Sequence, residues 1–193
     1  MSDFKFVPMD EDVSEILIPA AELKTIVSRL GKEITAHYKS AVEQGEKLLV
    51  VCVLKGSVIF FSDLVRAIDL PLELSFMQAS SYGKSTISGG VVEIRLAPTD
   101  AQLKDAHVLI VEDILDTGHT MHKVQSVLAD KGTKSVKLCT LLDKPSRRQA
   151  PITADFAGKE VPDLFVIGYG LDYGEKYRNL DYVGVLKPEV YEV

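Results

Sequence analysis

A buried strand that ends in two adjacent carboxylates is the feature that most constrains this chain. Residues 108–111 are four consecutive apolar β-formers, a pattern typical of a parallel strand that is covered on both faces. Glu112 and Asp113 follow where we expect the strand to end. A small, hydroxyl-rich loop at 116–120 then leads into apolar residues at helical spacing over 121–128. The pattern predicts a strand, an acidic corner, a tight loop and a helix whose N-terminus faces the loop.

The loop at 116–120 is suited to bind an anion. Backbone N–H groups and the positive end of a helix dipole favour phosphate at such a position. A simple N-cap turn would have the same local sequence, so this alternative stays open for the loop alone. The carboxylates are more informative, because open α/β sheets bind ligands at the carboxyl ends of their strands. Together they predict a ligand with both phosphate and hydroxyl groups, such as a sugar phosphate, and they also suit Mg2+.

Length and charge limit the class of protein. The chain has 193 residues, 46% of them hydrophobic and 26% charged, which suits one globular domain with a sizeable core. We therefore expect a single domain over 1–193. The net charge of −6 argues against a nucleic-acid-binding protein, since such proteins neutralise phosphates with Lys and Arg. No apolar run approaches the ~20 residues of a membrane helix, so we expect no membrane contact.

The two cysteines indicate a reducing compartment. Cys52 and Cys139 lie within apolar, strand-like runs and form no CxxC motif. Such residues are typical of the core of a cytosolic protein. The acidic N-terminus lacks the basic and apolar regions of a signal peptide. A cytoplasmic location is therefore expected.

Strand-like and helix-like patterns alternate along the chain. Strands are expected at 47–54, 72–76, 91–94, 108–111, 135–142, 164–168 and 182–186, and helices at 22–43, 58–68 and after residue 120. This alternation predicts an α/β fold with a mostly parallel central sheet and helices on both faces. The proline-marked stretch at 145–162 is expected to be irregular. The linker at 82–90 is longer than a tight turn and contains glycine near both ends, which is typical of a mobile flap.

Two long motifs resemble one enzyme family. The run Val-Glu-Asp-Ile-Leu-Asp-Thr-Gly-His-Thr at 111–120 resembles the phosphoribosyl pyrophosphate (PRPP) motif of the phosphoribosyltransferases. The run Pro-Asp-Leu-Phe-Val-Ile-Gly-Tyr-Gly-Leu-Asp-Tyr at 162–173 resembles the 6-oxopurine branch of that family. With the shorter matches at 54–57 and 142–145, the resemblance covers about residues 47–186 in the right order. It implies the type I phosphoribosyltransferase fold, with a flap and a small hood formed by the terminal segments.

The resemblance assigns the first motif to PRPP. It implies that Glu112 and Asp113 hold the ribose hydroxyls and that Asp116 acts as the general base toward purine N7. The residues implied to bind the 5′-phosphate are Thr117, Gly118, His119 and Thr120. Those implied to bind the pyrophosphate are Lys55, Gly56 and Arg178, with a non-proline cis peptide before Lys55 turning backbone N–H groups toward it.

The second motif and Lys144 are assigned to the purine. The resemblance implies that the Lys144 ammonium donates to purine O6, that Phe165 stacks on the ring and that the backbone at Val166 reads its edge. It also places Asp172 on a Mg2+ that the pyrophosphate binds, and it gives Glu112, Asp113 and Asp172 as the metal-binding carboxylates. Without the resemblance, Lys144 would be a solvated lysine at a strand end and Phe165 a core residue.

The function implied is transfer of 5-phosphoribose from PRPP to N9 of hypoxanthine or guanine, with Mg2+ as cofactor. Closure of a flap that begins at Ser81 and Tyr82 would keep water from the reacting centre. The expected partners are PRPP, a 6-oxopurine and further copies of the chain in a homodimer or homotetramer. Two alternatives stay open: an enzyme that prefers xanthine, and a PRPP-sensing regulator on the same fold that binds RNA or DNA.

Overall fold

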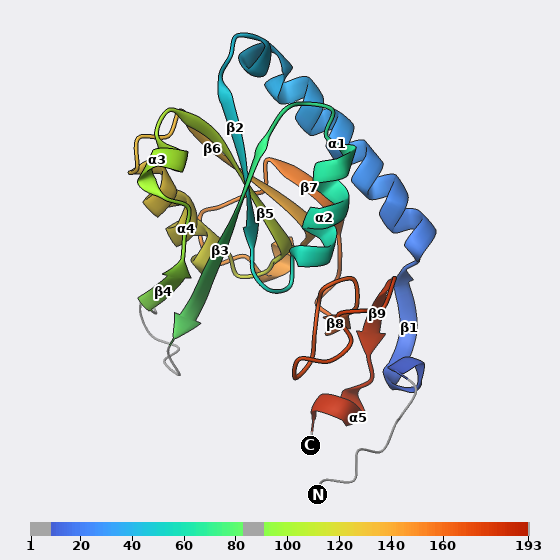
Figure 1. Ribbon diagram of the computed structural model, residues 1–193. Helices are drawn as coiled ribbons and strands as arrows, with labels where there is room; N and C mark the ends of the chain where they lie inside the picture. Colours follow the sequence, from blue (N-terminus) through green and yellow to red (C-terminus); the bar gives the residue numbers. More distant parts are fainter. Residues whose placement is uncertain (1–8, 83–90, 193) are drawn as a thin grey trace, which may run out of the picture.

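A six-stranded sheet forms the centre of the computed structural model, which describes residues 9–82 and 91–192 (Figure 1). The strands lie in the order β4-β3-β2-β5-β6-β7. Their bounds are β2 Lys47–Val53, β3 Glu73–Tyr82, β4 Val91–Leu96, β5 Ala106–Leu115, β6 Ser135–Asp143 and β7 Phe156–Glu160. All neighbouring pairs are parallel except β3 and β4, which pair antiparallel at one edge. The predicted mostly parallel α/β sheet is thus confirmed.

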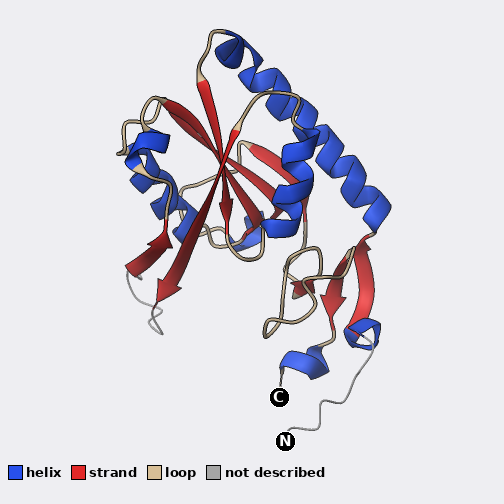
Figure 2. Cartoon of the chain, in the orientation of Figure 1, coloured by secondary structure: helices blue, strands red, loops and turns tan. Residues whose placement is uncertain are grey.

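Helices cover both faces of this sheet (Figure 2). The long α1 (Ala20–Glu43) and α2 (Val58–Ala67) pack on one face, whereas α3 (Asp100–Leu103) and α4 (His119–Ala129) pack on the other. The two helices of the first face approach closely at Gly31, where a Cβ would lie 2.4 Å from the carbonyl oxygen of Ala67. Because helices cover both faces, the central strands are buried on both sides, as their continuous apolar sequences predict. Among the described residues no helix is both long and apolar enough to cross a membrane.

A second, three-stranded antiparallel sheet lies beyond the carboxyl ends of the parallel strands (Figure 1). It contains β1 (Val13–Ile18), β9 (Val183–Leu186) and β8 (Val166–Ile167), in that order, and α5 (Pro188–Tyr191) follows β9. We call this sheet, with the segment 165–192 and the N-terminal residues 9–18, the hood. Hood formation from the two terminal segments was predicted.

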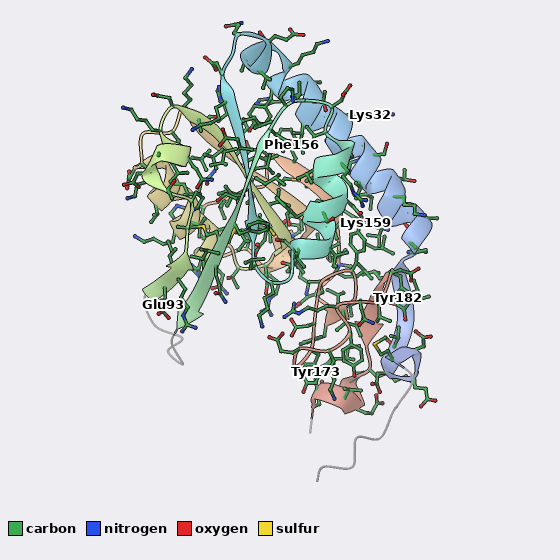
Figure 3. All side chains as sticks on the ribbon, viewed as in Figure 1. Lys32, Glu93, Phe156, Lys159, Tyr173 and Tyr182 are labelled. Atoms are coloured by element: carbon green, nitrogen blue, oxygen red, sulfur yellow. The ribbon has the colours of Figure 1, made fainter. Side chains whose placement is uncertain are left out.

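The hood has its own small core and its own polar contacts. Ile167, Leu180 and Leu186 are buried in it, and its tyrosines pack around them (Figure 3, where Tyr173 and Tyr182 are labelled). The hydroxyl of Tyr182 donates to Asp10 Oδ1 at 2.7 Å. A similar hydrogen bond of 2.6 Å joins the Tyr177 hydroxyl to Asp12 Oδ2. The acidic N-terminal residues therefore bind the C-terminal part of the chain.

Several elements differ from the sequence-based expectation, and three of these differences concern parallel or hood strands. The strand expected at 108–111 continues to Leu115, because β6 offers it backbone partners up to the pair Leu115 and Asp143. The stretch expected to be irregular contains β7, which gains its strand geometry from parallel pairing with β6. The strand expected at 164–168 is restricted to Val166–Ile167, the residues that pair with β9.

The predicted flap falls mainly on residues 83–90, which lie outside the described residues. Ser81 and Tyr82 belong to β3, but their side chains are also outside the described part of the chain. The flap and the role of these two residues therefore stay predictions.

Candidate active site

Two half-buried carboxyl groups, those of Glu112 and Asp113, lie near the carboxyl end of β5. Burial, together with the neighbouring charge of Asp113, raises the pKa of Glu112 well above its usual range. Burial also raises the pKa of Asp113 to about 6, although Asp113 Oδ1 accepts a hydrogen bond of 2.7 Å from the backbone N–H of Ile114. Glu112 Oε2 has no hydrogen-bond partner among the described residues. A buried oxygen of this kind is a site for a ligand hydroxyl or a cation.

The loop after the acidic pair leads directly into the N-terminus of α4. Gly118, the residue before the helix, has a φ of 85°, and a Cβ at this position would lie 2.6 Å from Ile152 Cγ2. Both the conformation and the close packing therefore favour glycine. No side chain in the described part of the molecule caps this helix end. The first N–H groups of α4 are thus suited to bind the oxygens of a phosphate.

The segment that follows Lys144 forms hydrogen bonds with the backbone of the same loop. The backbone N–H groups of Gln149 and Ala150 both donate to the carbonyl oxygen of Thr117, at 3.0 Å each. Arg148 Nη1 donates to the carbonyl oxygen of Asp116 at 2.9 Å. The loop at 116–120 is therefore held in place by residues some 30 positions away in the sequence.

The loop after β2 lies between the acidic pair and the hood. The peptide bond between Leu54 and Lys55 is cis, as the resemblance predicts. A Cβ at Gly56 would lie 1.6 Å from Asp113 Oδ2, and a Cβ at Gly170 would lie 2.0 Å from the carbonyl oxygen of Gly56. Only glycine fits at both positions, so the backbone of this loop approaches the acidic pair and the hood closely.

Two cations and two carboxylates gather where this loop meets the hood. Arg178 Nη2 lies 2.9 Å from Asp172 Oδ1, and Arg178 Nη1 donates to the carbonyl oxygen of Gly170 at 2.8 Å. Glu175 Oε2 contacts both Lys55 Nζ, at 3.1 Å, and Arg178 Nη2, at 3.3 Å. Arg178 Nε is buried and has no partner among the described residues. This corner therefore offers positive charge and an unsatisfied donor to an anion.

A cleft of about 480 Å³ separates the carboxyl edge of the sheet from the hood. Its volume suits a small molecule of nucleotide size. Five of the predicted site residues line it: Asp116, Lys144, Phe165, Val166 and Asp172. The other lining residues are Ile114, Arg147, Asp163, Leu164, Leu171 and Tyr191.

Lys144 is a buried cation at one end of the cleft, with only 8% of its surface exposed. Its Nζ donates to the carbonyl oxygen of Leu164 at 2.6 Å and lies 3.7 Å from Asp163 Oδ1. The interpretation of Lys144 as a solvated strand-end lysine is thus wrong. Its ammonium is held at the cleft wall, where it can donate to a ligand oxygen.

Phe165 presents an aromatic ring to the cleft and is 39% exposed. Its ring stacks on Tyr191 with a centroid distance of 4.9 Å and an interplanar angle of 22°. Tyr173 meets its edge at 5.5 Å and 88°. Phe165 is therefore neither fully buried nor isolated, and its orientation is set by two tyrosines of the hood.

Asp116 is linked through Arg147 to Asp163, which lies just before the hood. Arg147 Nε donates to Asp116 Oδ1 at 3.1 Å, while Arg147 Nη1 lies 3.4 Å from Asp163 Oδ2. Asp163 in turn faces Lys144. A chain of alternating charges thus runs from the loop at 116–120 to Lys144, which also lines the cleft.

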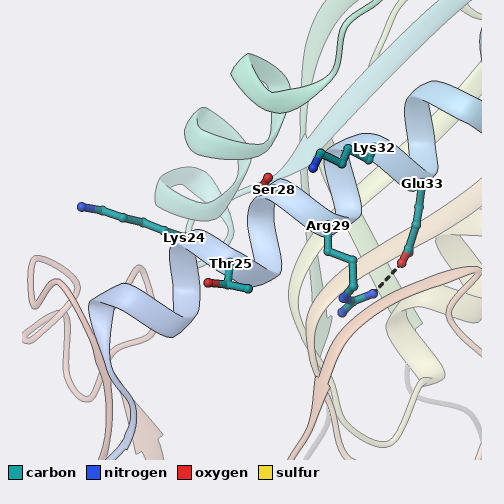
Figure 4. A pocket seen from close by; sticks show the side chains of 6 residues that line it. All are labelled: Lys24, Thr25, Ser28, Arg29, Lys32 and Glu33. Carbon is teal, nitrogen blue, oxygen red and sulfur yellow. Dashed lines mark hydrogen bonds and ion pairs between the residues drawn. The ribbon is translucent and has the colours of Figure 1, made fainter.

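A second hollow lies on the outer surface of α1 (Figure 4). It has a volume of about 540 Å³ and is lined by Lys24, Thr25, Ser28, Arg29, Lys32 and Glu33. None of the predicted site residues lines it, and its one ion pair, Arg29 with Glu33 at 2.9 Å, stays within α1. Five of the predicted site residues line the cleft between sheet and hood instead.

The contacts also include residues that the sequence interpretation did not single out. They are Arg147, Arg148, Asp163, Glu175 and Tyr191. The two arginines follow the predicted base-binding lysine within four positions, and Asp163 stands inside the second motif, so their neighbourhood was a usable signal. Tyr191 carries no local signal, because it reaches the cleft only through the folding of the C-terminus. His119, in the loop at 116–120, lies with Nε2 3.1 Å from Gln149 Oε1.

Comparison with known proteins agrees with this geometry. The family model of the phosphoribosyl transferase domain matches residues 21–174 of the sequence. The chain therefore belongs to this family. It is 47% identical over 184 residues to the hypoxanthine-guanine phosphoribosyltransferase of Bacillus subtilis, covering 95% of this chain and 99% of that protein.

Solved structures of the same kind extend the similarity to the whole fold. A hypoxanthine phosphoribosyltransferase from Staphylococcus aureus superimposes with a TM-score of 0.86 at 45% identity, covering 95% of this chain and 96% of that chain. A Trypanosoma cruzi hypoxanthine phosphoribosyl transferase gives 0.88 at 37% identity, covering 96% and 97%. The predicted resemblance to the 6-oxopurine branch is therefore confirmed.

Proposed function

We propose that this chain transfers 5-phosphoribose from PRPP to N9 of hypoxanthine or guanine, giving IMP or GMP and pyrophosphate in purine salvage. One observation carries the proposal: a single cleft is lined by Asp116 and Lys144 from the sheet side and by Phe165 and Asp172 from the hood. Such a transfer requires both substrates to bind in one cavity with their reacting atoms aligned. Similarity over nearly the full length to a hypoxanthine-guanine phosphoribosyltransferase supports the choice of base.

In this proposal the loop after β5 holds the phosphoribosyl group. The N–H groups at the start of α4 bind the 5′-phosphate, and residues Thr117 to Thr120 surround it. Glu112 and Asp113 accept hydrogen bonds from the ribose hydroxyls, which would satisfy the unpartnered Glu112 Oε2. The positive charge that develops on the ribose as pyrophosphate leaves would favour the ionised form of these carboxyls over the neutral form that burial favours, and their negative charge would then stabilise it.

Mg2+ fits this site as an ion shared between the protein and its substrate. In the described ranges, no three His, Cys, Asp or Glu side chains gather closely enough to hold a metal by themselves. Magnesium commonly binds to one or two carboxylates and completes its coordination with substrate phosphates and water. Asp172 and the acidic pair are the carboxylates we propose for this role. When bound, Mg2+ neutralises charge on the leaving pyrophosphate.

The base half of the cleft favours a 6-oxopurine. The Lys144 ammonium would donate to purine O6, and Phe165 would stack on the ring. Adenine carries an amino group in place of O6, so two donors would face each other there. Asp116 would accept the proton from N7, with its carboxylate oriented by the hydrogen bond from Arg147.

We also propose that the chain acts as a homo-oligomer in the cytoplasm. Val58, Ile59, Leu74 and Phe76 are exposed apolar residues on α2 and β3, and these two elements meet where Phe61 contacts Phe76. Such a surface suits a second copy of the chain. The two cysteines are unpaired and buried, which suits a reducing compartment. Light scattering of the purified protein would measure the mass of the assembly, and a monomer would contradict the proposal.

A steady-state assay tests the function. Purified protein is mixed with PRPP and Mg2+, and each of hypoxanthine, guanine, xanthine and adenine is supplied in turn while absorbance reports nucleotide formation. We expect turnover of hypoxanthine and guanine and little turnover of adenine. A clear preference for xanthine would instead favour that alternative. No turnover of any base, together with tight binding of RNA or DNA, would favour the regulator, which the net charge of −6 does not support.

A further inference from the structure

Glu175 lies where the negative charge of a ligand is expected. Its Oε2 contacts Lys55 Nζ at 3.1 Å and Arg178 Nη2 at 3.3 Å. Lys55 comes from the loop after β2 and Arg178 from the hood, so one carboxylate oxygen bridges the two sides of the corner. These are the two cationic side chains that the family resemblance assigns to pyrophosphate. The protein therefore satisfies them with an anion of its own.

The backbone around Glu175 directs its side chain to this place. Glu175 has a φ of 67°, a value that residues other than glycine seldom adopt, and Gly174 before it has a φ of 58°. Its backbone N–H donates to Asp172 Oδ2 at 2.9 Å. Asp172 also pairs with Arg178. The turn from 172 to 175 is thus fixed at both its ends, and the carboxylate of Glu175 projects back over the two cations.

The contact is one that a ligand can replace. The side chains of Glu175 and Lys55 are 64% and 58% exposed, and ion pairs this exposed are weak. Pyrophosphate carries several negative charges and many acceptor oxygens, so it would bind the same cations more strongly. The buried Nε of Arg178, which lacks a partner among the described residues, would remain available to the ligand.

We propose that Glu175 is a positioning residue that occupies the pyrophosphate site in the free protein and is displaced when the pyrophosphate group binds. This inference rests on the proposed function, since it assumes that Lys55 and Arg178 bind pyrophosphate. The exchange keeps both cations aligned between turnovers and lowers the affinity for the released product. Because of a competing internal contact, the apparent dissociation constant equals the intrinsic one divided by the fraction of molecules in which the site is open.

The test is calorimetric titration of the full-length protein with magnesium pyrophosphate. Glu175→Gln keeps the shape of the side chain but removes the competing charge, so we expect it to bind pyrophosphate about three- to tenfold more tightly than the wild type. Glu175→Asp keeps the charge but shortens the side chain, and its affinity should fall between the two. Glu43→Gln is the matched control, because Glu43 also pairs with a lysine, Lys39, at 63% exposure but lies on α1. Its affinity should stay within twofold of the wild type.

The outcomes separate this inference from the function on which it rests. If the wild type binds magnesium pyrophosphate and Glu175→Gln binds it equally or less tightly, Glu175 only supports the cations and the inference is wrong. A second outcome would also overturn the inference: Glu175→Gln binds more tightly, but Glu175→Asp binds as tightly as the wild type. The effect would then come from the net charge of the side chain and not from its contact with the two cations. If the wild type itself fails to bind, the proposed function fails and this inference fails with it. Thermal unfolding of each variant verifies that the fold is intact.

Discussion

On the sheet side of the cleft, Asp116 and Lys144 directly follow β5 and β6, two paired strands of 10 and 9 residues, whereas on the hood side Phe165 precedes a strand of only 2 residues. The hood side also holds non-glycine residues with positive φ, namely Tyr169, Glu175 and Tyr177. Its geometry includes side-chain contacts, such as the stack of Phe165 on Tyr191, besides short backbone pairings. On the sheet side, the two residues follow a long ladder of backbone hydrogen bonds.

This difference matches the chemistry proposed for each side. A group that transfers a proton must be held at one position, and a residue at the end of a long, buried ladder is held in that way. A group that binds a base or releases pyrophosphate must exchange contacts in every turnover. Side-chain pairs such as Lys55 with Glu175 can exchange without breaking a strand. We therefore expect substitutions on the sheet side to lower turnover and those on the hood side to change affinity.

The largest effect is expected for Asp116→Asn. The substitution keeps the shape of the side chain but removes the proton acceptor, so kcat should fall by about 10²- to 10⁴-fold, the usual contribution of a general base. The dissociation constant of PRPP should change little. Asp100→Asn serves as control, because it removes another paired carboxylate on α3, at the opposite end of β5. Near-normal turnover of Asp116→Asn would remove Asp116 from the proposed role.

Lys144→Met should have the next largest effect and tests whether the sheet side also selects the base. Hydrogen bonds to charged groups contribute about 1.5–3 kcal/mol, so kcat/KM for hypoxanthine and guanine should fall by roughly ten- to a few hundred-fold. PRPP affinity should barely change, because its phosphates bind elsewhere. The same substitution at Lys137, at the start of β6 and paired with Asp155, should leave both quantities unchanged.

Full efficiency of Lys144→Met with hypoxanthine would contradict the base-pocket assignment. A loss of PRPP binding instead would mean that Lys144 serves the phosphates. Either result would also remove the argument that adenine is rejected at this position.

The two walls of the cleft also differ in how far the sequence predicts them. The strand, acidic pair, loop and helix from 108 to 128 are contiguous, so a local pattern contains nearly all the information on their arrangement. Parallel strands that alternate with helices allow few topologies, which is why the sheet was predicted correctly. The exception is β7, whose sequence Phe-Ala-Gly-Lys-Glu has no apolar run and becomes a strand through pairing with β6.

The hood depends on residues that are far apart in the sequence. In its sheet Val13 pairs with Leu186, and β1 contains no continuous apolar pattern. The pairing of Lys55 with Glu175 spans 120 residues, so no local pattern could indicate it. The long motif at 162–173 indicated the family of the hood residues, but the contacts of Glu175 and Tyr191 required the folded chain.

The smallest effect is expected for Tyr191→Leu, which tests whether the hood tunes base affinity alone. Tyr191 stacks on Phe165 at 4.9 Å and lines the cleft. Aromatic pairs of this kind contribute about 0.5–1.5 kcal/mol beyond the area they bury, which corresponds to roughly two- to tenfold in affinity. We expect KM for hypoxanthine to rise by that factor while kcat and the affinity for PRPP stay nearly constant. Tyr191→Phe keeps the ring and should behave as the wild type. A fall in KM for Tyr191→Leu would mean that the tyrosine ring competes with the purine for Phe165, and a large loss of kcat would mean that the hood also positions the reacting atoms.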